Sequence, residues 1–297
     1  MLSLRDTLTF ARKDNVSEGL RHGSLINIFN QAGFKTFWIS NQFSRGYHDN
    51  MTSVLAHDAK VVNFINNSDK SYITEKLRDS HYDEKLLSPI RQALRDQAHK
   101  KIIFVHLGGS HTPYSYRFPE QFDFFRENNQ NAFTREFDDY DNSIRYTDYF
   151  LHHLIQILDS TNHTTALYYS PDHGEDLLDD DRKRFLHASP HPTYYQLHIP
   201  LFLWFSDQYR QEFPERYATA LANQTQPVST IVAFHTMLDM ASITTPLLNT
   251  GYSLISPDYK ARRRMYLTDH DQPIFWYNSG LKKQDKAMIE KNHLDHR

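Results

Sequence analysis

The chain has 297 residues, of which 39% are hydrophobic and 14% aromatic, a globular composition that excludes a disordered chain. Lysine and arginine number 33 against 36 aspartates and glutamates, and the formal net charge of -3 argues against generic nucleic-acid binding. The absence of cysteine excludes disulfides, thiolate zinc sites and a cysteine nucleophile, whereas 18 histidines stand out.

Short apolar runs alternate along the chain with segments of helical periodicity. This pattern predicts an α/β fold, a mostly parallel sheet with helices on both faces. We expect helices at 24–33, opened by Ser24 and stopped by Gly33, at 141–160, and at 229–241, opened by Ser229. Strands are expected at 34–40, in KKIIFVHLGGSH at 100–111, in TTALYYSPDHG at 164–174, and at 199–206. One face of the second helix is expected to carry Ile144, Thr147, Leu151, Leu154 and Leu158.

No linker or repeat divides the chain, so we expect one domain over 1–297, with a core at about 1–250 and a peripheral C-terminal part at 251–297. The longest apolar runs, such as 199–205, are too short to span a bilayer, and the N-terminus lacks the layout of a signal peptide. We therefore expect no transmembrane domain in this chain and expect the chain as given to be soluble.

Two of the expected strands end in potential metal ligands. The segment FVHLGGSH brings His106 and His111 to the end of one strand, and LYYSPDHGE brings Asp172, His173 and Glu175 to the end of the next. If the two strands are parallel, these side chains meet at one edge of the sheet, where α/β proteins bind ligands. A carboxylate beside an imidazole suits a zinc-type ion and leaves positions open for a substrate. The sequence therefore predicts a metal site.

Simpler interpretations remain beside this one. His106 fits a packed or hydrogen-bonded role equally well, and Asp172 with His173 could form a helix cap and its neighbour. The acidic run 179–181 is expected to be a solvated loop, because three successive carboxylates repel one another. Tyr168 and Tyr169 are interpreted as core residues. Histidines without a spacing signal, expected at the surface, are His22, His48, His152, His153 and His163.

Several ordered blocks resemble one known family. SPDHGEDL followed by RFLHASPHPTYYQLHIPLFLWFS looks like a signature block of the cell-envelope phosphoethanolamine transferases, which belong to the alkaline phosphatase and sulfatase superfamily. FVHLGGSHTPYSYRFPEQFDFF and YDNSIRYTDYFLHHLIQIL are similar to two further blocks of this family. LTFARKDN and LINIFNQAGFKTFWISNQ resemble the segment that follows the family's nucleophile. The resemblance implies an alkaline phosphatase/sulfatase-like fold, truncated at its N-terminus.

The resemblance also implies an activity. Asp172 and His173 would hold a catalytic zinc ion, Zn2+, and the enzyme would transfer phosphoethanolamine from phosphatidylethanolamine to lipid A or another cell-envelope acceptor. Zinc lowers the pKa of a bound hydroxyl and stabilises charge on phosphoryl oxygens, which suits an anionic diester. The implied location is the periplasmic face of the bacterial inner membrane, with membrane attachment through an N-terminal domain outside this chain. No nucleic-acid partner is implied.

Further roles follow from the same resemblance. His111 and His187 would bind the phosphoryl group or a second zinc, Glu175 would support that site, and His106 would orient the groups around it.

The family's nucleophile is a threonine, which the matching blocks place just upstream of Met1. Ser3, Thr7 and Thr9 match the helix behind the nucleophile rather than the nucleophile itself. We therefore expect no measurable transfer by residues 1–297 alone and at most weak zinc-dependent hydrolysis. Two alternatives stay open: a phosphoglycerol transferase of the same superfamily, and a catalytically inactive zinc-binding fragment. A sulfatase activity is discounted, because the chain has no cysteine or serine in the required stretch.

Overall fold

The computed structural model describes residues 23–44, 50–66, 82–126, 132–187, 191–262, 264–267, 274–276 and 280–292. Ser3, Thr7, Thr9, His22 and His48 lie outside the described residues. Contacts divide the chain into two compact units, one formed by residues 26–161 and the other by residues 162–297 with the start of the chain up to Leu25.

A parallel three-stranded sheet organises the unit of residues 26–161. Strand β1 (Lys35–Ser40) lies between β2 (Val61–Phe64) and β3 (Lys101–His106), and both neighbours run parallel to it. Five of the six β1 residues are buried, as expected for the central strand of a parallel sheet. The register pairs Ser40 with His106, so a histidine ends β3 beside the end of β1.

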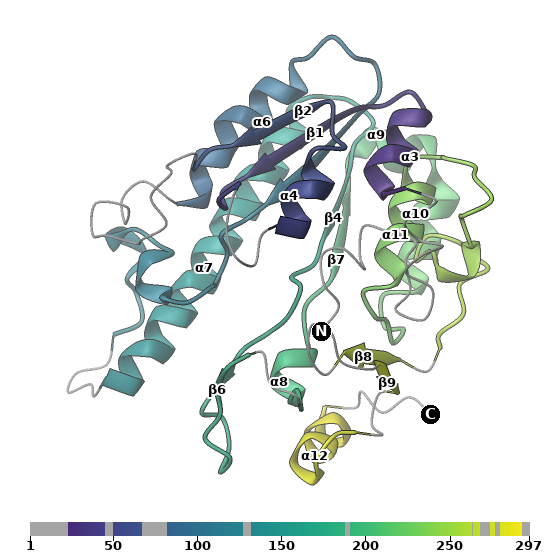
Figure 1. Cartoon of the computed structure of the whole chain (residues 1–297). Coiled ribbons are helices and arrows are strands. Elements are labelled where there is room, and N and C mark those ends of the chain that lie inside the picture. Colours follow the sequence, from purple (N-terminus) through teal and green to yellow (C-terminus); the bar gives the residue numbers. More distant parts are fainter. Residues whose placement is uncertain are drawn as a thin grey trace. The chain divides into compact units, whose positions relative to one another are not determined.

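Helices flank this sheet. They are α3 (Leu25–Gln31), α4 (Asn50–Ala56), α6 (Leu87–Leu94) and α7 (Ala132–Asp159), with short 3-10 turns η2 (Asp83–Leu86), η3 (Tyr114–Tyr116) and η4 (Glu120–Phe122). Figure 1 shows β1 and β2 side by side, with α6 beside them, and α6 contacts both β1 and α7. The predicted stop at Gly33 is confirmed: its φ of +81° is easily adopted only by glycine, and the next N–H, of Phe34, returns to the Phe29 carbonyl.

Helix α7 is longer than predicted and buries a slightly different face. It begins at Ala132 rather than near 141. The prediction that Ile144 lies on the buried face is wrong, because this side chain is 47% exposed while Tyr146 and Phe150 are almost completely buried. The two aromatic rings rotate the apolar stripe away from Ile144. The other four predicted positions of the stripe are buried: Thr147, Leu151, Leu154 and Leu158.

The unit of residues 162–297 contains β4 (Ala166–Tyr169) and β7 (Phe202–Phe205), which pair with each other. Both strands were predicted, and β7 runs antiparallel to β4. A parallel pair requires a crossover connection, usually a helix of several turns. The chain between β4 and β7 instead forms the hairpin of β5 (Asp176–Leu177) and β6 (Phe185–Leu186), followed by the four-residue α8 (Tyr194–Leu197).

The rest of this unit is helical, with one small sheet. Its elements are α9 (Asp207–Glu212), α10 (Pro214–Ala222), α11 (Val232–Met240), η5 (Thr250–Tyr252), β8 (Met265–Leu267), β9 (Ile274–Trp276) and α12 (Lys283–Lys291). The predicted cap of α11 is wrong: Ile231 occupies the N-cap position, and Ser229 contributes its backbone carbonyl to the Val232 N–H. Residues beyond 250 supply buried side chains, since Tyr266 and Ile289 pack in one cluster with Tyr194.

Among the described residues, no helix is both long enough and apolar enough to cross a bilayer.

Candidate functional site

The loop after β4 holds Asp172 and His173 close together. The His173 backbone N–H donates to Asp172 Oδ1 at 3.1 Å, and Asp172 Oδ2 lies 3.7 Å from His173 Nε2. The other ring nitrogen of His173, Nδ1, lies 2.8 Å from the Gly174 carbonyl oxygen. Because a carbonyl only accepts, Nδ1 carries a proton and the neutral ring has its lone pair on Nε2. The Asp172 carboxylate and the unprotonated nitrogen of His173 therefore lie close together.

His187 and Glu175 form a second pair in the same unit. His187 Nδ1 lies 3.0 Å from both oxygens of the Glu175 carboxylate, which is buried. The hydrogen bond to Glu175 raises the pKa of His187 above its ordinary value, against the opposing effect of burial. A carboxylate that accepts from Nδ1 fixes the orientation of an imidazole and makes its other nitrogen a better ligand.

The two pairs lie against each other. The rings of His173 and His187 have centroids 3.9 Å apart. One atom each of His173, Glu175 and His187 lie within 4.8 Å of one another, and among the described residues these three side chains form the group that could hold a metal ion. Asp172 stands at its edge, with a side chain that is 58% exposed. We call His173, Glu175 and His187 the metal-ligand group, because their side chains are of the types that bind metals and lie close together; the name assigns no ligand.

Helix α8 holds the backbone of this loop in place. Gly174 donates its N–H to the Gln196 carbonyl at 2.9 Å. A Cβ on Gly174 would lie 2.2 Å from the Tyr195 carbonyl oxygen, so only glycine fits between His173 and Glu175. The next residue, Asp176, is buried and accepts hydrogen bonds from the Thr193 hydroxyl and the Gln196 side-chain amide. Burial raises the pKa of Asp176, and these hydrogen bonds act in the opposite direction.

The second predicted strand end lies in the unit of residues 26–161. His106 Nδ1 lies 3.1 Å from Ser40 Oγ, and its ring packs against Trp38 at 5.7 Å between centroids. His106 is thus both packed and hydrogen-bonded, as one of the two interpretations expected. His111 is exposed, and its Nδ1 donates to the Thr112 carbonyl at 2.7 Å.

A buried carboxylate organises the loop before His111. Asp83 is 5% exposed and accepts hydrogen bonds from the N–H groups of Gly108 and Gly109, at 2.8 and 2.9 Å, and from the Asn41 amide at 2.7 Å. Arg117 donates from Nε to the His111 carbonyl at 2.5 Å. Asp83 was not predicted from the sequence, because a lone aspartate at the start of a short 3-10 helix carries no spacing signal that distinguishes it from a surface residue.

The remaining predictions concern residues away from the metal-ligand group. Asp179 and Asp181 are exposed as expected, whereas Asp180 is half-buried and paired with Arg182 at 2.5 Å. The hydroxyl of Tyr168 is buried and its pKa is raised by burial, which agrees with a core role. Three histidines without a spacing signal, at 152, 153 and 163, lie on or near the surface.

The fold and the site together are those of an α/β protein with a histidine and carboxylate site suited to a divalent metal. The family model for sulfatases matches residues 2–243, and the chain belongs to the sulfatase family. This match supports the superfamily assignment drawn from the sequence blocks.

Comparison with individual proteins narrows the likeness further. The chain is 32% identical over 272 residues to phosphoethanolamine transferase EptC of Escherichia coli strain RS218, covering 88% of this chain and 45% of that protein. Phosphoethanolamine transferase CptA of Salmonella typhimurium is 30% identical over the same shares. The chain therefore spans less than half the length of these curated relatives.

A solved structure gives the same result for the fold. The C-terminal periplasmic domain of EptC from Escherichia coli, in complex with zinc, matches with a TM-score of 0.81 and 29% identity, over 95% of this chain and 79% of that one. The predicted fold class is confirmed by this likeness.

Proposed function

We propose that the chain is the zinc-binding catalytic part of a phosphoethanolamine transferase, with Asp172 and His173 as zinc ligands. The observation that carries this proposal is the separation of 3.7 Å between Asp172 Oδ2 and His173 Nε2. Two ligands of a tetrahedral zinc ion, at bond lengths of about 2.0–2.1 Å, are about 3.4 Å apart, so a small adjustment brings both atoms onto one ion. The relatedness to a domain that was solved with zinc supports the same metal.

The other histidines are proposed to bind the phosphoryl group or a second zinc. Glu175 contacts His187 Nδ1 through both carboxylate oxygens at 3.0 Å, which agrees with a role for Glu175 in orienting the His187 ring. His111 is proposed as the second residue on the phosphoryl group, held by its hydrogen bond to Thr112 and by Arg117 on its carbonyl. His106 is proposed to steady the end of β3 through Ser40.

The chemistry follows from these donors. When bound, zinc lowers the pKa of a coordinated hydroxyl and stabilises negative charge on the phosphoryl oxygens. The residues of this chain position the diester, with the His187 imidazole next to the anionic phosphoryl group. Glu175 keeps the His187 ring in one orientation while charge develops on the substrate.

The proposed substrates are phosphatidylethanolamine as donor and lipid A or another envelope acceptor. The curated relatives are phosphoethanolamine transferases, which supports phosphoethanolamine as the transferred group. The similar solved domain is periplasmic, which supports a periplasmic location. The membrane is proposed as the place where donor and acceptor meet the site.

A labelled-donor assay tests this function. The protein is expressed from its gene together with any coding sequence before Met1, loaded with zinc, and given fluorescent phosphatidylethanolamine or fluorescent phosphatidylglycerol. We expect zinc-dependent release of diacylglycerol from phosphatidylethanolamine, abolished by Asp172→Ala. Preferential turnover of phosphatidylglycerol supports the phosphoglycerol transferase alternative instead, and release that is indifferent to Asp172→Ala contradicts the proposal.

A further inference from the structure

The β5–β6 hairpin connects the members of the metal-ligand group. Glu175 precedes the first residue of β5, and His187 follows the last residue of β6. The register pairs Asp176 with Leu186 and Leu177 with Phe185, so continuing it by one position sets Glu175 opposite His187. The hairpin register therefore determines whether the carboxylate and the imidazole meet. A slip of one residue would turn the side chain at that position to the other face.

The hairpin backbone is under local strain. Leu178, Lys183 and Leu186 have φ angles of 62°, 49° and 67°, in the left-handed region that residues with a side chain avoid. One of the three, Leu186, directly precedes His187. Such conformations persist where surrounding contacts hold them in place. The hairpin thus needs anchors beyond the short ladder between β5 and β6.

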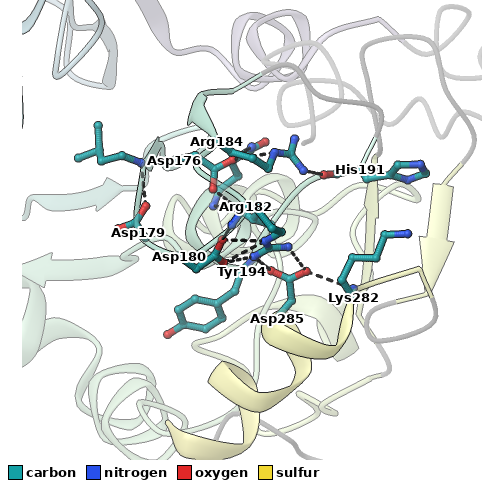
Figure 2. Close-up of polar contacts among 12 residues, drawn as sticks. Asp176, Asp179, Asp180, Arg182, Arg184, His191, Tyr194, Lys282 and Asp285 are labelled. Carbon is teal, nitrogen blue, oxygen red and sulfur yellow. Dashed lines mark hydrogen bonds and ion pairs between the residues drawn. The ribbon is translucent and has the colours of Figure 1, made fainter. Parts of the chain in front are cut away.

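One anchor comes from helix α12. Arg182, near the hairpin tip, donates from Nη1 and Nη2 to the two oxygens of Asp285 at 2.9 and 2.8 Å, and also pairs with Asp180. The Asp285 side chain is completely buried. Figure 2 shows the Arg182 guanidinium between the carboxylates of Asp180 and Asp285, with Asp285 on the helix that follows Lys282. A planar guanidinium that meets two carboxylates in this way is held in one geometry.

The same carboxylate holds helix α8. Asp285 Oδ1 also accepts the Tyr194 backbone N–H at 2.9 Å, and Oδ2 accepts the Lys282 N–H at 3.1 Å, which fixes the start of α12. Helix α8 in turn contacts Gly174 and Asp176 on either side of Glu175. One buried carboxylate therefore anchors both the hairpin that leads to His187 and the helix that holds the loop of His173.

We infer that Asp285 is a positioning residue for the metal site: through Arg182 and Tyr194 it holds the hairpin and α8 in the conformation that brings His173, Glu175 and His187 together. The inference rests on the proposed zinc function. Asparagine at position 285 keeps the size of the side chain but loses its charge and one acceptor. Arg182 then keeps Asp180 and one oxygen at position 285, but one of its N–H groups faces an amide NH2 instead of a carboxylate oxygen, so the anchor that opposes the hairpin's strain is weakened.

Zinc affinity measures this effect directly. Asp285→Asn is compared with Glu290→Gln, which makes the same carboxylate-to-amide change on an exposed position of the same helix. Zinc dissociation constants are determined by competition with a chromophoric chelator, at a temperature where circular dichroism shows each variant folded. We expect Asp285→Asn to weaken zinc binding by about tenfold or more, which is the usual effect of losing a group that orients metal ligands. Glu290→Gln should keep wild-type affinity, and Asp285→Glu, which restores the charge, should recover part of the loss.

Two further variants keep the outcomes distinct. If Asp285→Asn does not fold, Arg182→Lys carries the test, because lysine keeps the positive charge but cannot bridge two carboxylates with a planar fork; it should weaken zinc binding by about tenfold as well. His173→Ala tests the zinc site itself. Retention of zinc by His173→Ala overturns the proposed function. Loss of zinc in His173→Ala combined with wild-type affinity in a folded Asp285→Asn or Arg182→Lys overturns the positioning role alone.

Discussion

Replacing Gly174 by alanine places a methyl group where the structure leaves no room. The added Cβ would lie 2.2 Å from the Tyr195 carbonyl oxygen, whereas ordinary contact begins at 3.4 Å. The loop and α8 must separate by about 1 Å, and no side-chain rotation can absorb a shift between two backbones. The hydrogen bond from the Gly174 N–H to the Gln196 carbonyl is lost with it. Overpacking costs about 1–3 kcal/mol and the hydrogen bond about 1 kcal/mol, so the free energy of unfolding should fall by about 2–4 kcal/mol.

The separation also moves the two neighbours of Gly174, His173 and Glu175, so zinc affinity should fall at least about tenfold. Urea unfolding measures the first effect and zinc titration the second. Gly33→Ala is the control: Gly33 has a φ of +81° with nothing within 4 Å of an added Cβ, so alanine there should cost about 1–2 kcal/mol of backbone strain and leave zinc affinity unchanged. A Gly174→Ala protein with wild-type stability and zinc affinity refutes the packing described for this loop.

Two further outcomes are expected from single substitutions. Asp83→Asn turns an amide NH2 group toward at least one of the N–H donors of Gly108, Gly109 and Asn41. The free energy of unfolding, measured with urea, should fall by about 1–3 kcal/mol. Unchanged stability would contradict the role given to this carboxylate. His111→Ala and His187→Ala should each weaken binding of inorganic phosphate or phosphoethanolamine to the zinc-loaded protein while leaving the far-ultraviolet circular dichroism spectrum unchanged; undiminished phosphate binding in both variants counts against the phosphoryl role.

The elements were predictable where one pattern dominates locally. Strand β1 and helix α3 have continuous or periodic apolar residues and a glycine stop, so local sequence alone indicates them. The antiparallel direction of β7 was not predictable in this way, because strand direction depends on whether the intervening chain makes a crossover. The burial of Ile144 was predicted wrongly for a related reason. An apolar side chain at helical spacing is buried only if larger neighbours on the helix do not face the core in its place.

The candidate site shows a similar division. The strand-end pattern singled out His173 and Glu175, the family resemblance added His187, and the structure brings these three together. Asp285 was not singled out, because its partner Arg182 is 103 residues away along the chain, and an acidic residue in the first turn of a helix is usually only a cap. The positive φ angles between Leu178 and Leu186 could not be predicted either, because no glycine in this segment indicates them. Long-range anchors of this kind become visible only in the folded chain.

Metal analysis of four variants tests the central claim, that Asp172 and His173 hold zinc. Asp172→Ala and His173→Ala each remove one of the two ligand atoms that lie 3.7 Å apart, whereas His152→Ala and His153→Ala remove imidazoles from helix α7. After equilibration with zinc and removal of the excess, the zinc content of each folded variant is measured by atomic emission. We expect the first two variants to lose most of their bound zinc and the two helix variants to retain it; equal zinc in all four would contradict the assignment of the site.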